Sequence, residues 1–271
     1  MYSHVSHQID QPILDISKLS VTYEGRSAIK DITFHLHVGE RVAVVGPNGA
    51  GKSTLFKVVA GVLSSDTGHV SVYGSKPGGH ICIAYLPQHS QVDWRFPVNV
   101  ADVVMMGRIA KLGWFGWPRK RDWDYVHGAL ETVGMAGFAS LQIGQLSGGQ
   151  QQRMFIARAL AQEAELMLMD EPLSGLDTPS QEGLLGLLGD LQRKRVTVMV
   201  ATHDLEQAAL NFDRILLLNH SLIAFGSGTD VLKPENLLRA YAGRLKVVDG
   251  QIPLVALDDA CCGGDGHDHV G

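Results

Sequence analysis

Two segments near the N-terminus alternate apolar and polar residues. Residues 13–23 and 32–38 follow the two-residue period of strands that have one buried face. Glu24 and Gly25, which lie between the two segments, favour a turn. The pattern therefore predicts two strands of an antiparallel sheet at the start of the domain.

Three later runs are almost wholly apolar: residues 42–45, 166–169 and 196–201. Strands of a sheet that is covered on both faces have this composition. A segment with helical periodicity follows each run, and the three segments begin near Gly51, Ser180 and Leu205. This alternation predicts an α/β fold with a central, mostly parallel sheet and right-handed crossovers.

The interval between the first two buried runs has a different pattern. Residues 98–106 and 122–133 have helical periodicity, so we expect residues 92–164 to form a mostly helical subdomain inserted into the α/β core. The folded domain is expected to span residues 11–240. A polar tail at residues 1–10 precedes it, and an extension at residues 241–271 follows it.

A later predicted helix, residues 179–195, carries Gly183, Gly186 and Gly189 at every third position. Each glycine costs a helix roughly 1 kcal/mol relative to alanine. We interpret the three glycines as a stripe that lets another element pack closely, and not as a binding site.

The composition limits the function classes. The 271 residues are 45% hydrophobic, enough for one large core with a smaller attached subdomain. A formal net charge of −5 without a long basic run argues against nucleic acid as a partner. The apolar runs are far shorter than the ~20 residues that span a bilayer, and the N-terminus lacks the pattern of a secretory signal. Three cysteines do not make a disulfide framework, so we expect a cytoplasmic protein.

The segment between the first buried run and its helix matches the phosphate-loop pattern G-x-x-x-x-G-K-[ST]. Its residues are Gly46, Pro47, Asn48, Gly49, Ala50, Gly51, Lys52, Ser53 and Thr54. Glycines let backbone N–H groups converge on phosphate oxygens, and the helix N-terminus adds partial positive charge. Lys52 can then reach the β- and γ-phosphates, and Ser53 can ligate Mg²⁺. The strand–loop–helix context makes this a specific signal.

Two acids, Asp170 and Glu171, end the second buried run. Asp170 at the strand tip can hold Mg²⁺ through water, and Glu171 can polarise an attacking water molecule. Taken alone, an acid pair at a strand end is as often merely solvated. The phosphate loop earlier in the chain favours the catalytic interpretation.

A helical run at residues 151–161 is preceded by the pentapeptide Leu146-Ser147-Gly148-Gly149-Gln150. Ser147 occupies the N-cap position, and the glycines leave a bare helix N-terminus, which is a second anion site. With this pentapeptide the sequence resembles the ATPase subunits of ABC transporters, over about residues 11 to 240.

The resemblance implies a head-to-tail dimer that holds two ATP molecules at its interface. Each γ-phosphate lies between the phosphate loop of one copy and residues 147–150 of the other, namely Ser147, Gly148, Gly149 and Gln150. Hydrolysis would open the dimer, and the movement would be passed to a membrane permease.

The resemblance also implies roles for four single residues. Tyr23 resembles the aromatic residue that stacks on adenine, and Gln88 resembles the glutamine that links Mg²⁺ and water to the permease contact. Asp177 resembles the aspartate that crosses the dimer interface. His203 follows the third buried run and resembles the histidine that senses the γ-phosphate.

Residues 91–108 and 112–114 are similar to the manganese, zinc and iron uptake branch of the family, in which an aspartate and an aromatic residue precede Phe-Pro-Val. A plainer interpretation is a groove of exposed aromatics that accepts any permease helix. Because the ATPase does not touch the ion, this segment indicates the permease, and the ion only by association. We expect manganese first and zinc or iron next. The chain would lie at the cytoplasmic face of the membrane, with an extracytoplasmic metal-binding protein as an indirect partner.

The extension ends in a tract with four metal-ligand side chains: Cys261, Cys262, His267 and His269. Thiolates and imidazoles suit a soft or borderline ion such as Zn²⁺ better than Mn²⁺. The alternative is a solvated end that contains these side chains by chance.

Two rival functions remain. A soluble ABC ATPase that acts on ribosomes or DNA would have no permease, but such proteins usually carry two ATPase halves or a long coiled coil, and neither occurs here. A scaffold that does not hydrolyse ATP would normally lack Glu171 or His203, and both are present.

Overall fold

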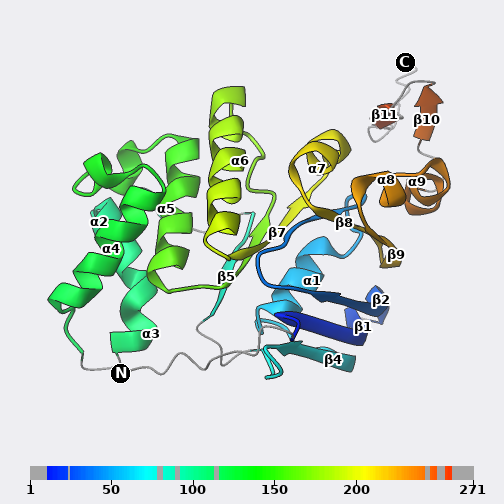
Figure 1. Ribbon diagram of the computed structural model, residues 1–271, viewed down its shortest axis with the longest axis horizontal. Coiled ribbons are helices and arrows are strands. Elements are labelled where there is room, and N and C mark those ends of the chain that lie inside the picture. Colours follow the sequence, from blue (N-terminus) through cyan, green and yellow to red (C-terminus); the bar gives the residue numbers. More distant parts are fainter. Residues whose placement is uncertain are drawn as a thin grey trace, which may run out of the picture.

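The computed structural model describes residues 11–23, 25–77, 82–88, 92–112 and 116–241, together with the backbone of residues 245–248 and 254–257. In Figure 1 the helices coloured green stand at the left of the molecule, and the three-stranded sheet, coloured blue to teal, lies at the lower right. A six-stranded sheet lies between them.

The three-stranded antiparallel sheet has the order β2 (Arg26–Leu36), β1 (Leu14–Tyr23) and β4 (Thr67–Val72). The predicted antiparallel pair is confirmed, but β2 begins at Arg26 and not near residue 32. The alternating pattern misses the first part of β2 because of Asp31, whose φ of 51° accompanies a shift in the strand register. Because of this shift, Ile29 and Ile32 are both buried although they are three positions apart, and the two-residue alternation of the strand is interrupted.

The six strands of the central sheet, in spatial order, are β5 (Ile83–Leu86), β6 (Leu166–Asp170), β7 (Thr197–Thr202), β3 (Arg41–Val45), β8 (Arg214–Asn219) and β9 (Ser221–Gly226). The first five are parallel, and β9 is antiparallel to β8. The three apolar runs are β3, β6 and β7, so the predicted central sheet is confirmed. β5 has only four residues, too few for a periodicity to show.

The central sheet separates two cores. In β3, Val42 and Val44 pack with residues of α1 (Lys52–Val59) and the three-stranded sheet. Ala43 and Val45 pack on the opposite face with the helical region. Burial on both faces explains why these strands read as continuous apolar runs.

Further helices follow the strands at the edges of these cores. They are α6 (Thr178–Arg193), α7 (Leu205–Asn211), α8 (Gly228–Val231) and α9 (Pro234–Tyr241). The first turns of α1, α6 and α7 lie where the sequence predicts them. Beyond α9, β10 (Leu245–Val248) and β11 (Leu254–Leu257) pair as an antiparallel hairpin.

The region inserted between β5 and β6 is helical. Its elements are α2 (Val100–Met105), η1 (Met106–Arg108), α3 (Ile109–Leu112), α4 (Lys120–Thr132), η2 (Ala136–Phe138), η3 (Ile143–Gln145) and α5 (Gly148–Ala161). Among the residues that the structure describes, no helix is both long enough and apolar enough to cross a bilayer.

Arg108 is a buried cation that joins three parts of this region. Its guanidinium donates to Asp122 Oδ1 of α4 at 3.3 Å, to Ala161 O of α5 at 2.8 Å and to Glu163 Oε2 at 2.9 Å. Tyr125 covers it, with the ring centroid 4.1 Å from Cζ. The Met-Gly-Arg end of the segment that resembles the metal-uptake branch thus has a packing role as well.

Gly107 lies against the backbone of α5, and we expect Gly107→Ala to destabilise the fold by about 1–3 kcal/mol. A Cβ at this position would lie 2.2 Å from Arg158 O, so backbone would have to move. The matched control is Gly186→Ala in α6, where a Cβ would meet nothing within 4 Å. There we expect a gain of about 0.5–1 kcal/mol from helix propensity. Urea unfolding of both variants tests this; a gain for Gly107→Ala would contradict the packing argument.

The same geometry corrects the interpretation of the α6 glycines. Of the three, only Gly183 has a close neighbour, Arg153 Nη2, at 2.5 Å from a built Cβ. Gly186 has open space, and Gly189 has only ordinary contacts with Arg41 and Arg193 at 3.8 and 4.0 Å. The prediction of a close-packing stripe was wrong, because a three-residue spacing does not show what faces the helix.

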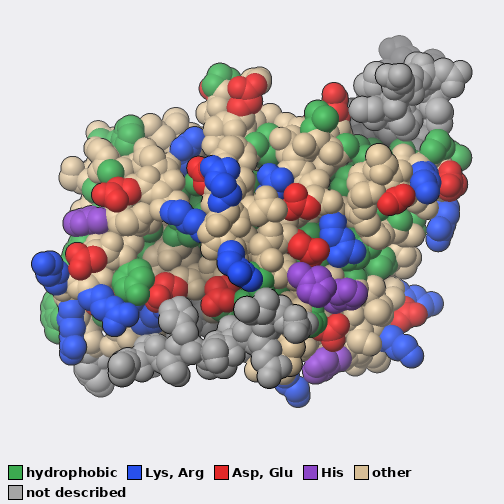
Figure 2. Space-filling view, viewed as in Figure 1, with side chains coloured by type: hydrophobic (Ala, Val, Ile, Leu, Met, Phe, Trp, Pro, Cys, Tyr) green, Lys and Arg blue, Asp and Glu red, His purple; other side chains and the backbone are tan. Residues whose placement is uncertain are grey.

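Charge is mixed on the face shown in Figure 2, where acidic and basic side chains are interspersed. This agrees with a net charge of only −5 in the whole sequence. A mixed face of this kind produces no strong field of one sign.

Candidate functional site

The strand order brings the predicted catalytic residues to one edge of the central sheet. Parallel strands β5, β6, β7 and β3 are neighbours, so their carboxyl ends lie side by side. Gln88 follows β5, Asp170 ends β6, His203 follows β7 and the phosphate loop follows β3. Residues more than a hundred positions apart in sequence therefore meet here.

The phosphate loop makes a tight connection from β3 to α1. Three of its glycines have positive φ: Gly46 at 155°, Gly49 at 79° and Gly51 at 98°. A Cβ on Gly51 would lie 2.4 Å from Ile29 Cγ2 and 2.7 Å from Ala28 O, so the loop is packed against β2. Ser53 and Thr54 then lie in the first turn of α1. A loop of this shape presents backbone N–H groups to an anion.

Lys52 is buried within the loop. Its ammonium group donates to Gly46 O at 2.7 Å and to Pro47 O at 3.1 Å. Burial lowers the pKa of Lys52 from its ordinary value, while the carboxylates of Glu171 and Asp170 act to raise it. Lys52 is thus held between loop carbonyls and two acids, where a phosphate can replace the carbonyls as its partner.

Glu171 is hydrogen-bonded on both its main chain and its side chain. Its N–H donates to Ala201 O of β7 at 3.0 Å, and its φ of 50° lies in the left-handed region. Gln88 Nε2 donates to Glu171 Oε2 at 2.8 Å, and His203 Nδ1 lies 3.9 Å from Glu171 Oε1. The structure therefore brings together three residues that the sequence predicts as catalytic. A carboxylate held in this way can accept a proton from water.

The side chains present fit a hard divalent cation. Ser53 offers a hydroxyl, Asp170 a carboxylate that is 5% exposed, and Gln88 an amide oxygen left over when its nitrogen donates to Glu171. Oxygen donors of this kind suit Mg²⁺. All three residues lie at the edge that carries the phosphate loop.

The pentapeptide forms a capped helix N-terminus. Ser147 N donates to Gln150 Oε1 at 2.9 Å, and Gln150 N donates to Ser147 Oγ at 3.4 Å. Leu146 before it is buried, and α5 begins at Gly148. Within the described residues, no hydrogen bond or ion pair joins this helix end to the phosphate loop. Among the described residues, the two anion sites of one chain therefore make no polar contact with each other.

Asp177 lies beside the pentapeptide. It caps α6, with Oδ1 accepting from Ser180 N at 3.0 Å, and hydrogen bonds from Ser180 lower its pKa. Gly149 faces the same serine, since a built Cβ would lie 2.9 Å from Ser180 Oγ. The N-termini of α5 and α6 therefore form one surface.

Two glutamines that the sequence analysis missed hold the loop between Glu171 and Asp177. Gln181 Nε2 donates to Leu173 O and Leu176 O at 3.2 and 3.1 Å, and Gln207 Nε2 donates to Gln181 Oε1 at 3.0 Å. The two glutamines and Leu173 line a cavity of about 190 Å³ whose lining also includes Glu171 and His203. No local motif marks the two glutamines, because their contact joins α6 to α7.

The remaining predicted residues are Tyr23 and the four side chains of the C-terminal tail. Tyr23 is at the end of β1 and is 42% exposed, so its ring is free to meet a ligand. The four ligand side chains of the tail, Cys261, Cys262, His267 and His269, lie outside the described residues, as do residues 89–91 and 113–115.

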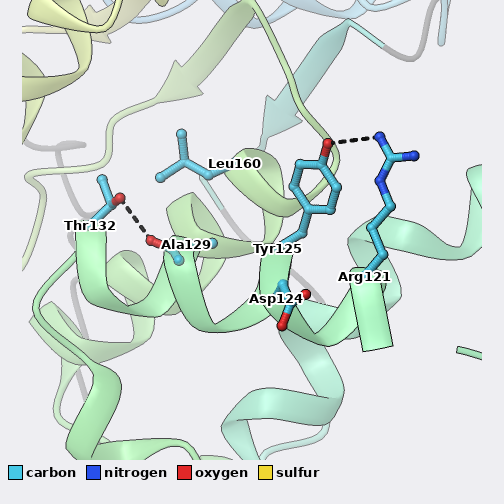
Figure 3. A pocket seen from close by; sticks show the side chains of 7 residues that line it. Arg121, Asp124, Tyr125, Ala129, Thr132 and Leu160 are labelled. Atoms are coloured by element: carbon cyan, nitrogen blue, oxygen red, sulfur yellow. Dashed lines mark hydrogen bonds between the residues drawn. The ribbon is translucent and has the colours of Figure 1, made fainter. Parts of the chain in front are cut away.

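A separate hollow of about 470 Å³ lies on α4 and α5 (Figure 3). Its lining includes Arg121, Tyr125, Ala129 and Leu160, and the Tyr125 hydroxyl is 3.3 Å from Arg121 Nη2. None of its lining residues belongs to the predicted site.

Comparison with known proteins identifies the family. A family model described as ABC transporter matches residues 29–174. The manganese transport system ATP-binding protein MntB of Halalkalibacterium halodurans is 48% identical over 236 residues, covering 86% of this chain and 94% of that protein. The zinc transport system ATP-binding protein TroB of Treponema pallidum is 43% identical over 235 residues, covering 86% and 88%.

A solved structure agrees with these matches. It is described as a metal-chelate type ABC transporter in an inward-facing conformation, and one of its chains superposes with a TM-score of 0.77 and 32% identity, covering 86% of this chain and 90% of that chain. The resemblance read from the phosphate loop and the pentapeptide is confirmed. The chain belongs to the ABC transporter family, as an ATP-binding and ATP-hydrolysing subunit.

Proposed function

We propose that this chain hydrolyses Mg²⁺-ATP at the interface of two copies and thereby drives a permease that imports a divalent transition metal, manganese first and zinc or iron next. The observation that carries the proposal is the meeting of Gln88, Glu171 and His203 at the strand edge that also carries the phosphate loop. The ATP-binding relatives support the same reading, and not a soluble ATPase of ribosomes or DNA.

Each residue at the edge has a proposed role. Tyr23 stacks on adenine, and the loop from Gly46 to Thr54 holds the phosphates through its N–H groups and Lys52. Ser53, Gln88 and Asp170 would hold Mg²⁺, which when bound would neutralise charge on the phosphate oxygens. Glu171 orients water and takes its proton, and His203 orients the γ-phosphate.

The lack of a polar contact between the two anion sites of one chain supports the head-to-tail dimer. Ser147, Gly148, Gly149 and Gln150 lie on a capped helix end that makes no polar contact with the phosphate loop of its own chain. In a head-to-tail dimer, a phosphate bound on the loop of one copy would meet this helix end of the second copy. Asp177, next to Gly149 through Ser180, would lie in the same interface.

Exposed apolar side chains support docking on a permease. Five of the large exposed hydrophobic residues fall within the helical region: Phe96, Met106, Ile109, Trp117 and Trp123. Exposed apolar side chains concentrated in one region are typical of an interaction surface. Docking there would hold the chain at the cytoplasmic face of the membrane.

The transported ion is inferred indirectly, from the branch of the family that the chain resembles. Residues 91–108 and 112–114 resemble the metal-uptake branch, and the manganese and zinc relatives support that branch. Several of these relatives are named for manganese, which supports manganese as the first choice. The four tail side chains, Cys261, Cys262, His267 and His269, are proposed as a separate zinc site.

We expect Phe96→Asp and Ile109→Asp to lower binding to permease-containing membranes at least tenfold, because each puts a charge on the proposed docking surface. ATP binding by the isolated subunit should be unchanged. Leu210→Asp, at an exposed leucine of α7 outside the helical region, is the control and should bind membranes like the parent. The measurement is cosedimentation with membrane vesicles prepared from the organism that makes this chain. Wild-type chain that sediments with ribosomes and not with these vesicles would favour the soluble alternative.

A further inference from the structure

The turn between β8 and β9 places a histidine behind the phosphate loop. Asn219 pairs with Ser221, so His220 alone forms the tip of the hairpin. Its φ is 56°, in the left-handed region that residues other than glycine seldom adopt. The turn is anchored by Asn219 Nδ2, which donates to Ala240 O of α9 at 2.9 Å.

His220 makes three hydrogen bonds to two different segments. Its N–H donates to Ala50 O of the phosphate loop at 2.9 Å, and its carbonyl accepts from Lys30 N of β2 at 2.6 Å. Its Nδ1 lies 3.1 Å from Ala28 O, also in β2. Because a carbonyl oxygen only accepts, Nδ1 carries the proton in this contact. One residue thus joins the phosphate loop to the three-stranded sheet.

Steric contacts at the same place leave the loop little freedom. A Cβ on Gly46 would lie 2.0 Å from Leu218 O of β8, and a Cβ on Gly51 would lie 2.7 Å from Ala28 O of β2. The phosphate loop is therefore enclosed by the end of β8 on one side and by the start of β2 on the other. Ala28 O, which His220 contacts, belongs to the second wall.

The start of β2 also determines where Tyr23 lies. Tyr23 pairs with Arg26, and Thr22 pairs with Ser27, directly before Ala28. We propose that His220 is a positioning residue for ATP, which fixes the distance between the phosphate loop and the β1–β2 turn. The triphosphate and the adenine of one ATP molecule can then bind both places without deforming the protein. This inference rests on the proposed role of Tyr23 as the adenine platform.

A pair of nearly isosteric substitutions tests the side-chain contact. In His220→Asn the amide nitrogen can take the place of Nδ1 and donate to Ala28 O, whereas in His220→Asp an acceptor faces that carbonyl. Asn and Asp both tolerate positive φ better than most residues, so the backbone contacts to Ala50 and Lys30 should persist. His220→Gln, whose amide matches Nε2 and not Nδ1, serves as a second variant without charge.

The readout is the affinity for Mg²⁺-ATP and for Mg²⁺-tripolyphosphate, measured by competition against a fluorescent ATP analogue. We expect His220→Asn to bind both ligands like the parent. His220→Asp and His220→Gln should bind ATP about three- to fivefold more weakly, because the hydrogen bond to Ala28 O is exposed and water can partly replace it. Their tripolyphosphate affinity should stay within about twofold, because that ligand does not reach the base site.

Two results would overturn the inference. One is an ATP affinity of His220→Asp and His220→Gln equal to that of His220→Asn. The other is an equal loss for ATP and tripolyphosphate, which would mean damage to the loop itself. Tyr23→Ala, measured alongside, separates this inference from the function on which it rests. Unchanged ATP affinity in Tyr23→Ala would contradict the role of Tyr23 as the adenine platform. If Tyr23→Ala weakens ATP binding but not tripolyphosphate binding, and His220→Asp binds ATP like the parent, only the role of His220 is contradicted.

Discussion

Glu171→Gln is expected to bind ATP with unchanged affinity but to lose at least 100-fold in turnover. The amide cannot take a proton from water, and a general base typically contributes 10²–10⁴-fold to a rate. The substitution is nearly isosteric, and the remaining carbonyl oxygen can still accept from Gln88 Nε2, which lies 2.8 Å from the carboxylate. The phosphate loop is untouched, so binding should persist and an ATP-bound dimer should accumulate.

Phosphate release at saturating ATP and size-exclusion chromatography with ATP measure the two halves of this expectation. Glu131→Gln removes an equivalent charge from the exposed face of α4 and should behave like the parent. Turnover of Glu171→Gln within tenfold of the parent would contradict the assignment of Glu171 as the base. A variant that fails to bind ATP would instead place Glu171 in the binding site.

Ser147→Arg is expected to leave ATP binding by the isolated subunit nearly intact and to abolish hydrolysis. The arginine replaces the capping hydroxyl of α5, which makes no polar contact with the phosphate loop of its own chain. In the proposed dimer it would instead block the phosphate held by the other copy. Hydrolysis should therefore be lost for the ATP that is bound to the partner's phosphate loop. A mixed dimer can test this.

The mixed dimer uses Lys52→Ala to inactivate a phosphate loop. A dimer with Ser147→Arg in one copy and Lys52→Ala in the other keeps one whole site, made of the intact loop and the intact pentapeptide. A dimer with both substitutions in one copy and none in the other keeps no whole site. We expect activity in the first arrangement and none in the second. Equal activity in the two arrangements would contradict the head-to-tail model.

The parts of the fold that follow from local pattern could be predicted from the sequence. Strands β3, β6 and β7 are buried on both faces, so their apolar runs stand out without any knowledge of their neighbours. The phosphate loop and the cap at Ser147 are local for the same reason, since each depends on a few consecutive residues. The bulge at Asp31 shows the limit, because one residue with positive φ interrupts the periodicity of β2.

The parts that depend on long-range pairing could not be predicted from pattern. The contact between Gln88 and Glu171 requires β5 to pair with β6, across 83 positions, and the four residues of β5 carry no visible period. The link from Gln207 to Gln181 joins two helices whose packing no motif records. For Gln88, the family resemblance supplied what periodicity lacked, and for Gln181, Gln207 and His220 nothing in the sequence did.

The left-handed backbone of Glu171 has a consequence for engineering. A residue other than glycine or asparagine costs on the order of 1 kcal/mol in this conformation, so position 171 carries strain that a catalytic carboxylate does not relieve. A library selected only for heat resistance would therefore be drawn toward Gly or Asn at position 171. Such a selection would enrich variants that are heat-stable but do not hydrolyse ATP. Any effort to stabilise this ATPase therefore has to screen for phosphate release in the same round.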